Sequence, residues 1–105
     1  MNIDTGPSID TLRQTLQAQL RQHSQDLAVL TAAGTDPGST GEDPQTVAER
    51  TVAARHAIEE IAAALSRITD GAYGHCERCT NPIPGARLEI LPHARFCVPC
   101  QARAR

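Results

Sequence analysis

The sequence predicts a mostly α-helical protein in which two long helices form an antiparallel coiled-coil hairpin and a small four-cysteine module follows. Three observations support this fold class. Two long segments repeat apolar residues every three or four positions, which is the spacing of one face of a helix. Four cysteines form two Cys-x2-Cys pairs in the last third of the 105 residues. With one Tyr, one Phe and no Trp, the chain has too few large side chains to bury an extensive globular core.

The first long helix is expected to begin after Ser8, which can cap it, and residues 1–7 are expected to form a flexible N-terminus. Gly34 is suited to a left-handed cap and is expected to end this helix. His23 lies on the apolar stripe, and we interpret it as a seam residue or a partner contact rather than a metal ligand. The predicted seam consists of Ile9, Leu12, Leu16, Leu20, His23, Leu27 and Leu30.

The second long helix is expected to follow a connector at about residues 34–43, which is rich in Gly, Pro, Ser, Thr and acidic residues. Asp43 can cap this helix, Pro44 suits its first position, and Asp70-Gly71 ends it. The predicted seam consists of Val47, Thr51, Ala54, Ile58, Ile61, Leu65 and Ile68. We interpret the two stripes as one intramolecular seam rather than as a dimer interface, so residues 8–71 should form a hairpin about 35 Å long in a monomeric protein.

The cysteine pairs, Cys76-x2-Cys79 and Cys97-x2-Cys100, are separated by 17 residues. A Cys-x2-Cys turn brings two thiolates to one side of a tight loop, and two such turns can close a tetrahedron around one zinc ion. We therefore expect one structural Zn²⁺ bound by all four cysteines, in a zinc-finger module that spans residues 72–105 and has a short C-terminal tail. A closed four-thiolate shell leaves no position for water or substrate, so we expect no enzymatic activity.

Other uses of the cysteines are less well supported. No apolar signal segment opens the chain and no membrane span is evident, so we expect a cytoplasmic protein in a reducing compartment, where disulfides are rare. Neither pair follows a buried strand, as a thioredoxin-type redox pair would. His75 and His93 could contribute to mixed ligation, but the two intact pairs already fill the shell. Oxidation of metal-free thiols remains an additional, redox-sensing possibility.

The net charge of −2 is unevenly distributed. Up to Ala72 there are ten acids and five arginines, and from Tyr73 onward two acids and five arginines. The finger is therefore only mildly basic and the hairpin is acidic, so we expect no specific DNA binding. Three acids, Asp36, Glu42 and Asp43, lie at the tip of the predicted hairpin. Solvated loops often carry acids, but a projecting acidic tip also suits a basic groove or a bound metal ion, so these three are candidate partner-binding residues.

The residues around the cysteines resemble a known signature. The pattern contains Tyr73-Gly74 and then Cys76-x2-Cys79-x3-Ile83-x3-Arg87-x4-Pro92-x4-Cys97-x2-Cys100-Gln101. It is similar to the zinc finger of the DksA/TraR family of bacterial transcription regulators. The clear similarity covers about Ile58 to Gln101, and the first helix matches only in its pattern.

This resemblance implies a protein that binds bacterial RNA polymerase rather than DNA or a membrane. The coiled coil of the family enters the secondary channel of the polymerase and brings acidic tip residues near the catalytic magnesium. The family's tip motif is Asp-x-x-Asp-x-Ala, whereas Asp43 here is followed by Thr46 in place of the second acid. An ungapped count instead places Asp36 near that second position, with Ala33 replacing the first acid. In either alignment one motif acid is present.

Family members that respond to the alarmone ppGpp carry basic residues at three positions. The corresponding residues here are Leu91, Gln101 and, by ungapped count, Glu60. A phosphate-rich ligand without cationic partners loses its charge-assisted hydrogen bonds, so we expect no ppGpp response through that site. The alternative hypothesis for function is a zinc-ribbon adaptor that contacts another protein through the hairpin. The sequence does not indicate which promoters respond or whether the effect on them is activation or inhibition.

Overall fold

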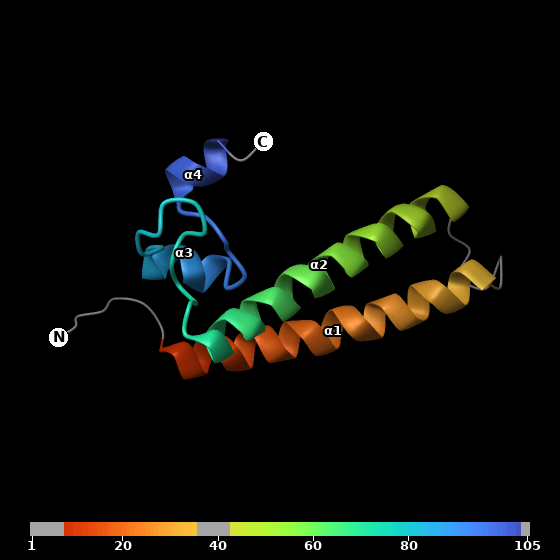
Figure 1. The fold of residues 1–105 in the computed structure, drawn as a ribbon. Helices are drawn as coiled ribbons and strands as arrows, with labels where there is room; N and C mark the ends of the chain where they lie inside the picture. Colours follow the sequence, from red (N-terminus) through yellow and green to blue (C-terminus); the bar gives the residue numbers. More distant parts are fainter. Residues whose placement is uncertain (1–7, 36–42, 104–105) are drawn as a thin grey trace.

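The computed structural model describes residues 8–35 and 43–103. Two antiparallel helices, α1 (Ile9–Thr35) and α2 (Pro44–Asp70), have 27 residues each and lie side by side along their length (Figure 1). Two short helices, α3 (Gly85–Ile90) and α4 (Val98–Arg103), belong to a small module at the C-terminal end of α2. The predicted fold class, a mostly α hairpin plus a four-cysteine module, is confirmed.

The hairpin helices begin at the residues that the sequence predicts. The Ser8 hydroxyl accepts a hydrogen bond from the Thr11 N–H at 3.1 Å, and the Asp43 carboxylate accepts one from the Thr46 N–H at 3.1 Å. Each cap satisfies one of the N–H groups that lack a partner at a helix start. Gly71 ends α2 in the left-handed region, with φ of 79°, as glycine at this position readily does.

The end of α1 differs by one residue from the prediction. Gly34 lies within α1, which ends at Thr35, so the prediction that Gly34 ends the helix is wrong. A difference of this size is common at helix ends, where the last turn frays. Helices of 27 residues are about 40 Å long at 1.5 Å per residue, slightly longer than the expected 35 Å.

Two separate apolar clusters hold the hairpin together. The cluster near the connector is small, because only Leu30, Val47 and Ala54 are buried there, with Leu27 packed against them. The cluster at the other end is larger and joins the hairpin to the finger. Its buried members are Leu12, Leu16, Ile61, Ala64, Tyr73, Cys76, Ile83, Leu88, Ala94 and Cys100.

The predicted seams are confirmed with two exceptions. Ile9 is 51% exposed, because the first residue of α1 has no preceding helical turn to cover it. Ala64 is completely buried although it was not assigned to the seam. It lies one turn beyond Ile61 and belongs to the cluster that also contains residues of α1 and of the finger. No helix of the described residues is long and apolar enough to cross a membrane.

Replacing Leu16 with Ala should lower the free energy of unfolding by about 2–5 kcal/mol, because it opens a cavity at a fully buried site. Replacing Ile9 with Ala, at the exposed start of the same stripe, should change it by about 0.5 kcal/mol or less. Urea unfolding of the zinc-loaded protein, followed by circular dichroism at 222 nm on the helix signal, measures both. Equal effects of the two substitutions would contradict the assignment of the core.

Candidate metal centre

The first cysteine pair lies on a tight turn that begins at Cys76, six residues after the end of α2. The Thr80 N–H donates to the Cys76 carbonyl at 2.9 Å, and the Cys76 N–H donates to the Asn81 carbonyl at 2.8 Å. Thr80 closes this turn with φ of 65°, a left-handed conformation that is uncommon for a β-branched residue. An isolated bridge between His75 and Pro82 brackets the turn. The chain therefore folds back around Cys76 and Cys79 and directs both sulfurs to one side.

The second pair lies at the start of α4. Cys97 directly precedes this helix, and Cys100 lies in its first turn. The Gln101 N–H donates to the Cys97 carbonyl at 2.8 Å, which winds the backbone so that the two cysteines face the same way. A loop turn and a helix start thus supply two sulfurs each.

The structure brings the four predicted ligands together. The Sγ atoms of Cys76, Cys79, Cys97 and Cys100 all lie within 4.8 Å of one another, and no disulfide joins them. The Cys79 and Cys97 sulfurs are 3.7 Å apart, which is close to the edge of a tetrahedron with Zn–S bonds of about 2.3 Å. Among the described residues, no histidine or carboxylate belongs to this group, so mixed ligation by His75 or His93 has no support.

Taken as thiols, Cys76 and Cys100 have pKa values shifted in opposite directions. Burial raises the pKa of the Cys76 thiol, but backbone N–H groups of Cys79, Cys97 and Arg78 hydrogen bond with its sulfur and bring the pKa down to about 6. A hydrogen bond with the Cys97 side chain, followed by burial, raises the pKa of Cys100 to about 12. Four thiolates this close together would repel one another, so a bound cation would stabilise them, and soft sulfur donors in a tetrahedral group favour Zn²⁺. A zinc ion bound here would supply a covalent-strength cross-link between the two turns.

The finger is attached to the hairpin by buried contacts as well as by the chain. The Tyr73 hydroxyl, close to the end of α2, donates to the Pro92 carbonyl at 2.7 Å. Burial raises the pKa of Tyr73 while the nearby charge of Arg67 lowers it, and the net shift is upward, so the phenol stays a neutral donor. Arg87, which the family resemblance fixes in the pattern, donates from Nε to the Phe96 carbonyl at 3.2 Å. Arg87 therefore ties α3 to the segment that carries Cys97.

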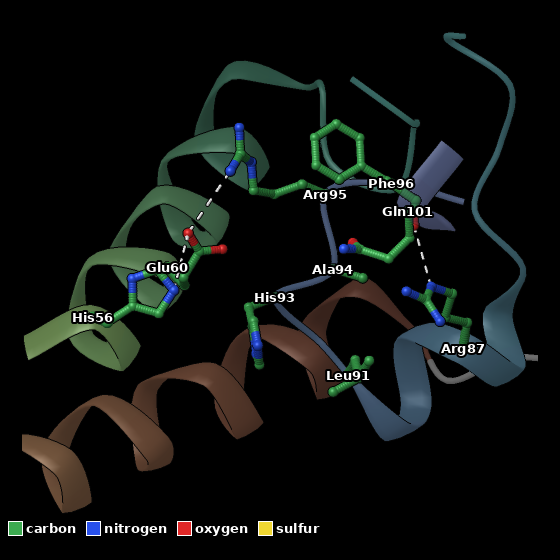
Figure 2. A pocket seen from close by; sticks show the side chains of 9 residues that line it. All are labelled: His56, Glu60, Arg87, Leu91, His93, Ala94, Arg95, Phe96 and Gln101. Carbon is green, nitrogen blue, oxygen red and sulfur yellow. Dashed lines mark hydrogen bonds and ion pairs between the residues drawn. The ribbon is translucent and has the colours of Figure 1, made fainter. Parts of the chain in front are cut away.

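A pocket of about 250 Å³ lies between α2 and the finger (Figure 2). It brings together Glu60, Leu91 and Gln101, the three residues that the sequence places at the family's alarmone positions, although they come from three segments of the chain. His93 also lines the pocket, and its Nδ1 atom has no hydrogen-bond partner among the described residues although it is buried. The remaining lining residues are His56, Arg87, Ala94, Arg95 and Phe96.

Of the three candidate tip residues, Asp43 is the one that the structure describes. Asp36 and Glu42 lie outside the described residues. Asp43 is exposed and directly precedes α2, at the end of the hairpin opposite the finger (Figure 1). One of its carboxylate oxygens is used in capping, which is a structural role beside any contact with a partner.

Removing zinc should unfold the finger, because its few apolar residues do not offset the entropy lost in ordering it. We expect one zinc per chain by elemental analysis, and we expect a strong chelator to abolish the dispersion of finger resonances in a ¹⁵N NMR spectrum. Since zinc binding releases thiol protons, the apparent zinc affinity should fall as the pH is lowered. A protein with less than stoichiometric zinc but a dispersed finger spectrum would contradict this site.

Comparisons with known proteins agree with this geometry. Residues 71–105 match the family model of the prokaryotic dksA/traR C4-type zinc finger, which confirms the prediction of a zinc site with four cysteine ligands. The chain is 46% identical over 48 residues to general stress protein 16O of Bacillus subtilis, covering 46% of this chain and 29% of that protein. It is 47% identical over 49 residues to the RNA polymerase-binding transcription factor DksA of Caulobacter vibrioides, covering 47% of this chain and 34% of that protein.

These matches span about a third of the length of the curated relatives. A shorter match, 59% identical over 27 residues, is to protein TraR of Escherichia coli and covers 26% of this chain and 37% of that protein. The fold as a whole is similar to that of transcription factor DksA2 from Pseudomonas aeruginosa, with a TM-score of 0.78 and 21% identity over 90% of this chain and 80% of that one. The chain thus has the fold of DksA2 and carries a dksA/traR C4-type zinc finger, and its similarity in sequence to DksA and TraR covers less than half of the chain.

Proposed function

We propose that this protein regulates bacterial transcription by binding RNA polymerase, with the hairpin inserted into the secondary channel. The observation that carries the proposal is that a slender hairpin about 40 Å long projects from a dksA/traR-type finger. The proposal is supported by the relative from Caulobacter vibrioides, which is described as an RNA polymerase-binding transcription factor. In this role the protein is a non-enzymatic cytoplasmic monomer without specific DNA binding.

The free end of the hairpin is suited to a narrow, basic passage. One small cluster of apolar residues, with Leu30, Val47 and Ala54 buried, holds the two helices together near the connector. Asp43 lies at this end, and Asp36 and Glu42 precede it in the sequence. A tip with three carboxylates would be attracted by basic groups and by a bound Mg²⁺ ion in the enzyme.

The zinc-loaded protein should bind bacterial RNA polymerase core and compete with another secondary-channel protein for it. The competition follows from the shape, since two hairpins cannot occupy one channel at the same time. Pull-down with immobilised core polymerase, followed by displacement with the second channel protein, measures both effects. If the protein neither binds nor competes, the proposal fails.

The alternative, an adaptor that contacts another protein along the hairpin, is favoured by the incomplete tip motif and by the capping role of Asp43. A tip-neutralised variant distinguishes the two functions. Asparagine keeps an oxygen that can cap α2, so it removes the charge of Asp43 without removing the cap. The variant combines Asp36→Asn, Glu42→Gln and Asp43→Asn.

The matched control removes three exposed acids near the finger instead, and it combines Asp10→Asn, Glu59→Gln and Asp70→Asn. If the tip acts inside the polymerase, the tip variant should bind the enzyme but lose its effect on open-complex lifetime, and the control should keep that effect. In vitro transcription with the cognate polymerase measures this. Equal activity of the two variants would favour the adaptor.

The proposed regulator acts without ppGpp. The pocket between α2 and the finger contains two arginines, but both already have partners. Arg87 donates to the Phe96 carbonyl, and Arg95 pairs with Glu60 and Glu77. The ion pair with Glu60 lies on the wall of the pocket itself, so a polyphosphate would have to break it and would then face a carboxylate.

Calorimetric titration of ppGpp into the complex with polymerase should show no binding at the pocket. Replacing both Leu91 and Gln101 with Lys should introduce binding, because it adds two cations to the pocket wall. The double variant therefore serves as the positive control. Tight binding of ppGpp to the unmodified complex that is lost on changing Gln101 to Glu would contradict the proposal.

A further inference from the structure

We propose that Glu77 fixes the orientation of the finger on the hairpin by holding two arginines, Arg67 of α2 and Arg95 of the finger. Arg95 in turn reaches Glu60, which lies two helical turns before Arg67 on α2. We call these four side chains, Glu60, Arg95, Glu77 and Arg67, the charge relay. The charge relay involves no partner molecule, so it can be tested whether or not the protein binds polymerase.

Each carboxylate oxygen of Glu77 contacts a different arginine. One carboxylate oxygen of Glu77 lies 3.3 Å from Nη1 of Arg67, and the other accepts a hydrogen bond from Nε of Arg95 at 3.1 Å. Nη1 of Arg95 lies 3.8 Å from the Glu60 carboxylate. The Arg95 guanidinium also lies over the Phe96 ring, 4.9 Å from its centre, which restricts where it can point. Figure 2 shows Arg95 extending from the finger toward Glu60 on α2.

Hydrogen bonds with backbone groups hold both arginines of the relay in place. The Glu77 N–H donates to the Arg95 carbonyl at 2.9 Å, so these two residues are joined by main chain and side chain. Nη2 of Arg67 donates to the carbonyls of His93 and Ala94, each at 3.4 Å. Arg67 thus contacts both the first cysteine turn, through Glu77, and the segment that leads to the second pair.

A single exposed ion pair contributes little to stability, typically about 0–1 kcal/mol. The relay differs because Glu77 binds two cations with its two oxygens, and because the Arg67 side chain is only 13% exposed. Loss of Glu77 would leave the Arg67 guanidinium in a largely buried position with only carbonyl partners. We therefore expect the members of the relay to act together rather than as separate surface contacts.

The spacing of the two attachment points explains why the relay controls orientation. Glu60 and Arg67 are seven residues apart on α2, so they lie on the same helical face, about 10 Å apart along the axis. One contact would act as a pivot, whereas two contacts along the helix resist rotation. The apolar contacts of the junction favour burial but are not directional. Glu77 itself lies between Cys76 and Cys79, so the zinc turn is the part of the finger that the relay holds.

The relay can be tested by measuring a distance between hairpin and finger in zinc-loaded protein. Spin labels at Val52 on α2 and Val98 on α4 are suitable, because these side chains are 67% and 57% exposed. The labels should be attached to genetically encoded ketone side chains so that the cysteines remain free for zinc. Pulsed electron paramagnetic resonance then gives the distribution of the distance.

We expect Glu77→Gln to broaden the distribution, because both ion pairs of Glu77 are lost. Glu60→Gln should broaden it less, since only the outer attachment point is removed. Glu59→Gln is the matched control, because it removes the same charge from the adjacent, exposed position of α2, and it should leave the distribution unchanged. About 1 M salt should move the unmodified protein toward the Glu77→Gln result, because it shortens the screening length to about 3 Å.

An unchanged distribution in Glu77→Gln protein that still holds one zinc per chain would overturn the proposal. If Glu77→Gln protein loses zinc, Arg95→Met decides the matter, because this residue lies outside both cysteine turns and Met keeps an unbranched apolar stem beside Phe96. Broadening in Arg95→Met protein with stoichiometric zinc supports the relay. An unchanged distribution there overturns it.

Discussion

The structure depends on one shared core, in which two of the zinc ligands belong to the same buried cluster as residues of the hairpin. Cys76 and Cys100 are buried in the same cluster as Leu16 of α1 and Ile61 of α2. A chain of this size, with one Tyr and one Phe, buries little apolar area and needs a cross-link. A structural zinc site contributes on the order of 10 kcal/mol or more, which is comparable with the whole stability of a small domain. Because metal and hairpin share this core, we infer that the zinc stabilises the base of the hairpin together with the finger.

Packing therefore decreases along the hairpin. At the finger end, buried residues come from both helices and from the whole finger, and the charge relay adds directional contacts. At the other end, three buried residues hold the helices together. A firmly held base with a slender, acidic free end is a suitable form for a protein that reaches into another molecule, and the proposed role at RNA polymerase uses this form. The pocket at the junction lies at the base of the hairpin, and its lining residues include none of the three candidate tip residues.

Much of the fold and the metal site could be predicted from the sequence, because their signals are local. Heptad-like spacing located both helices, the Ser8 and Asp43 caps marked their starts, and two Cys-x2-Cys pairs identified the ligands. The burial of Ala64 could not be predicted, because it lies beside the apolar stripe of α2, and periodicity does not show where residues of the finger join the hairpin core. The contact of Glu60 with Arg95, 35 positions later in the sequence, likewise has no local signature. Charge counts placed Arg95 in a basic finger, whereas the structure shows its guanidinium between two carboxylates.

Native-state hydrogen exchange with and without zinc tests the shared core most directly, because amide protection reports local opening free energies along the helices. If the zinc centre and the hairpin share a core, zinc removal should abolish protection around Leu16 in α1 and Ile61 in α2 as well as in the finger. If the base of the hairpin kept its full protection while the finger alone became unprotected, the zinc centre and the hairpin would be independent units, and a shared core would be contradicted.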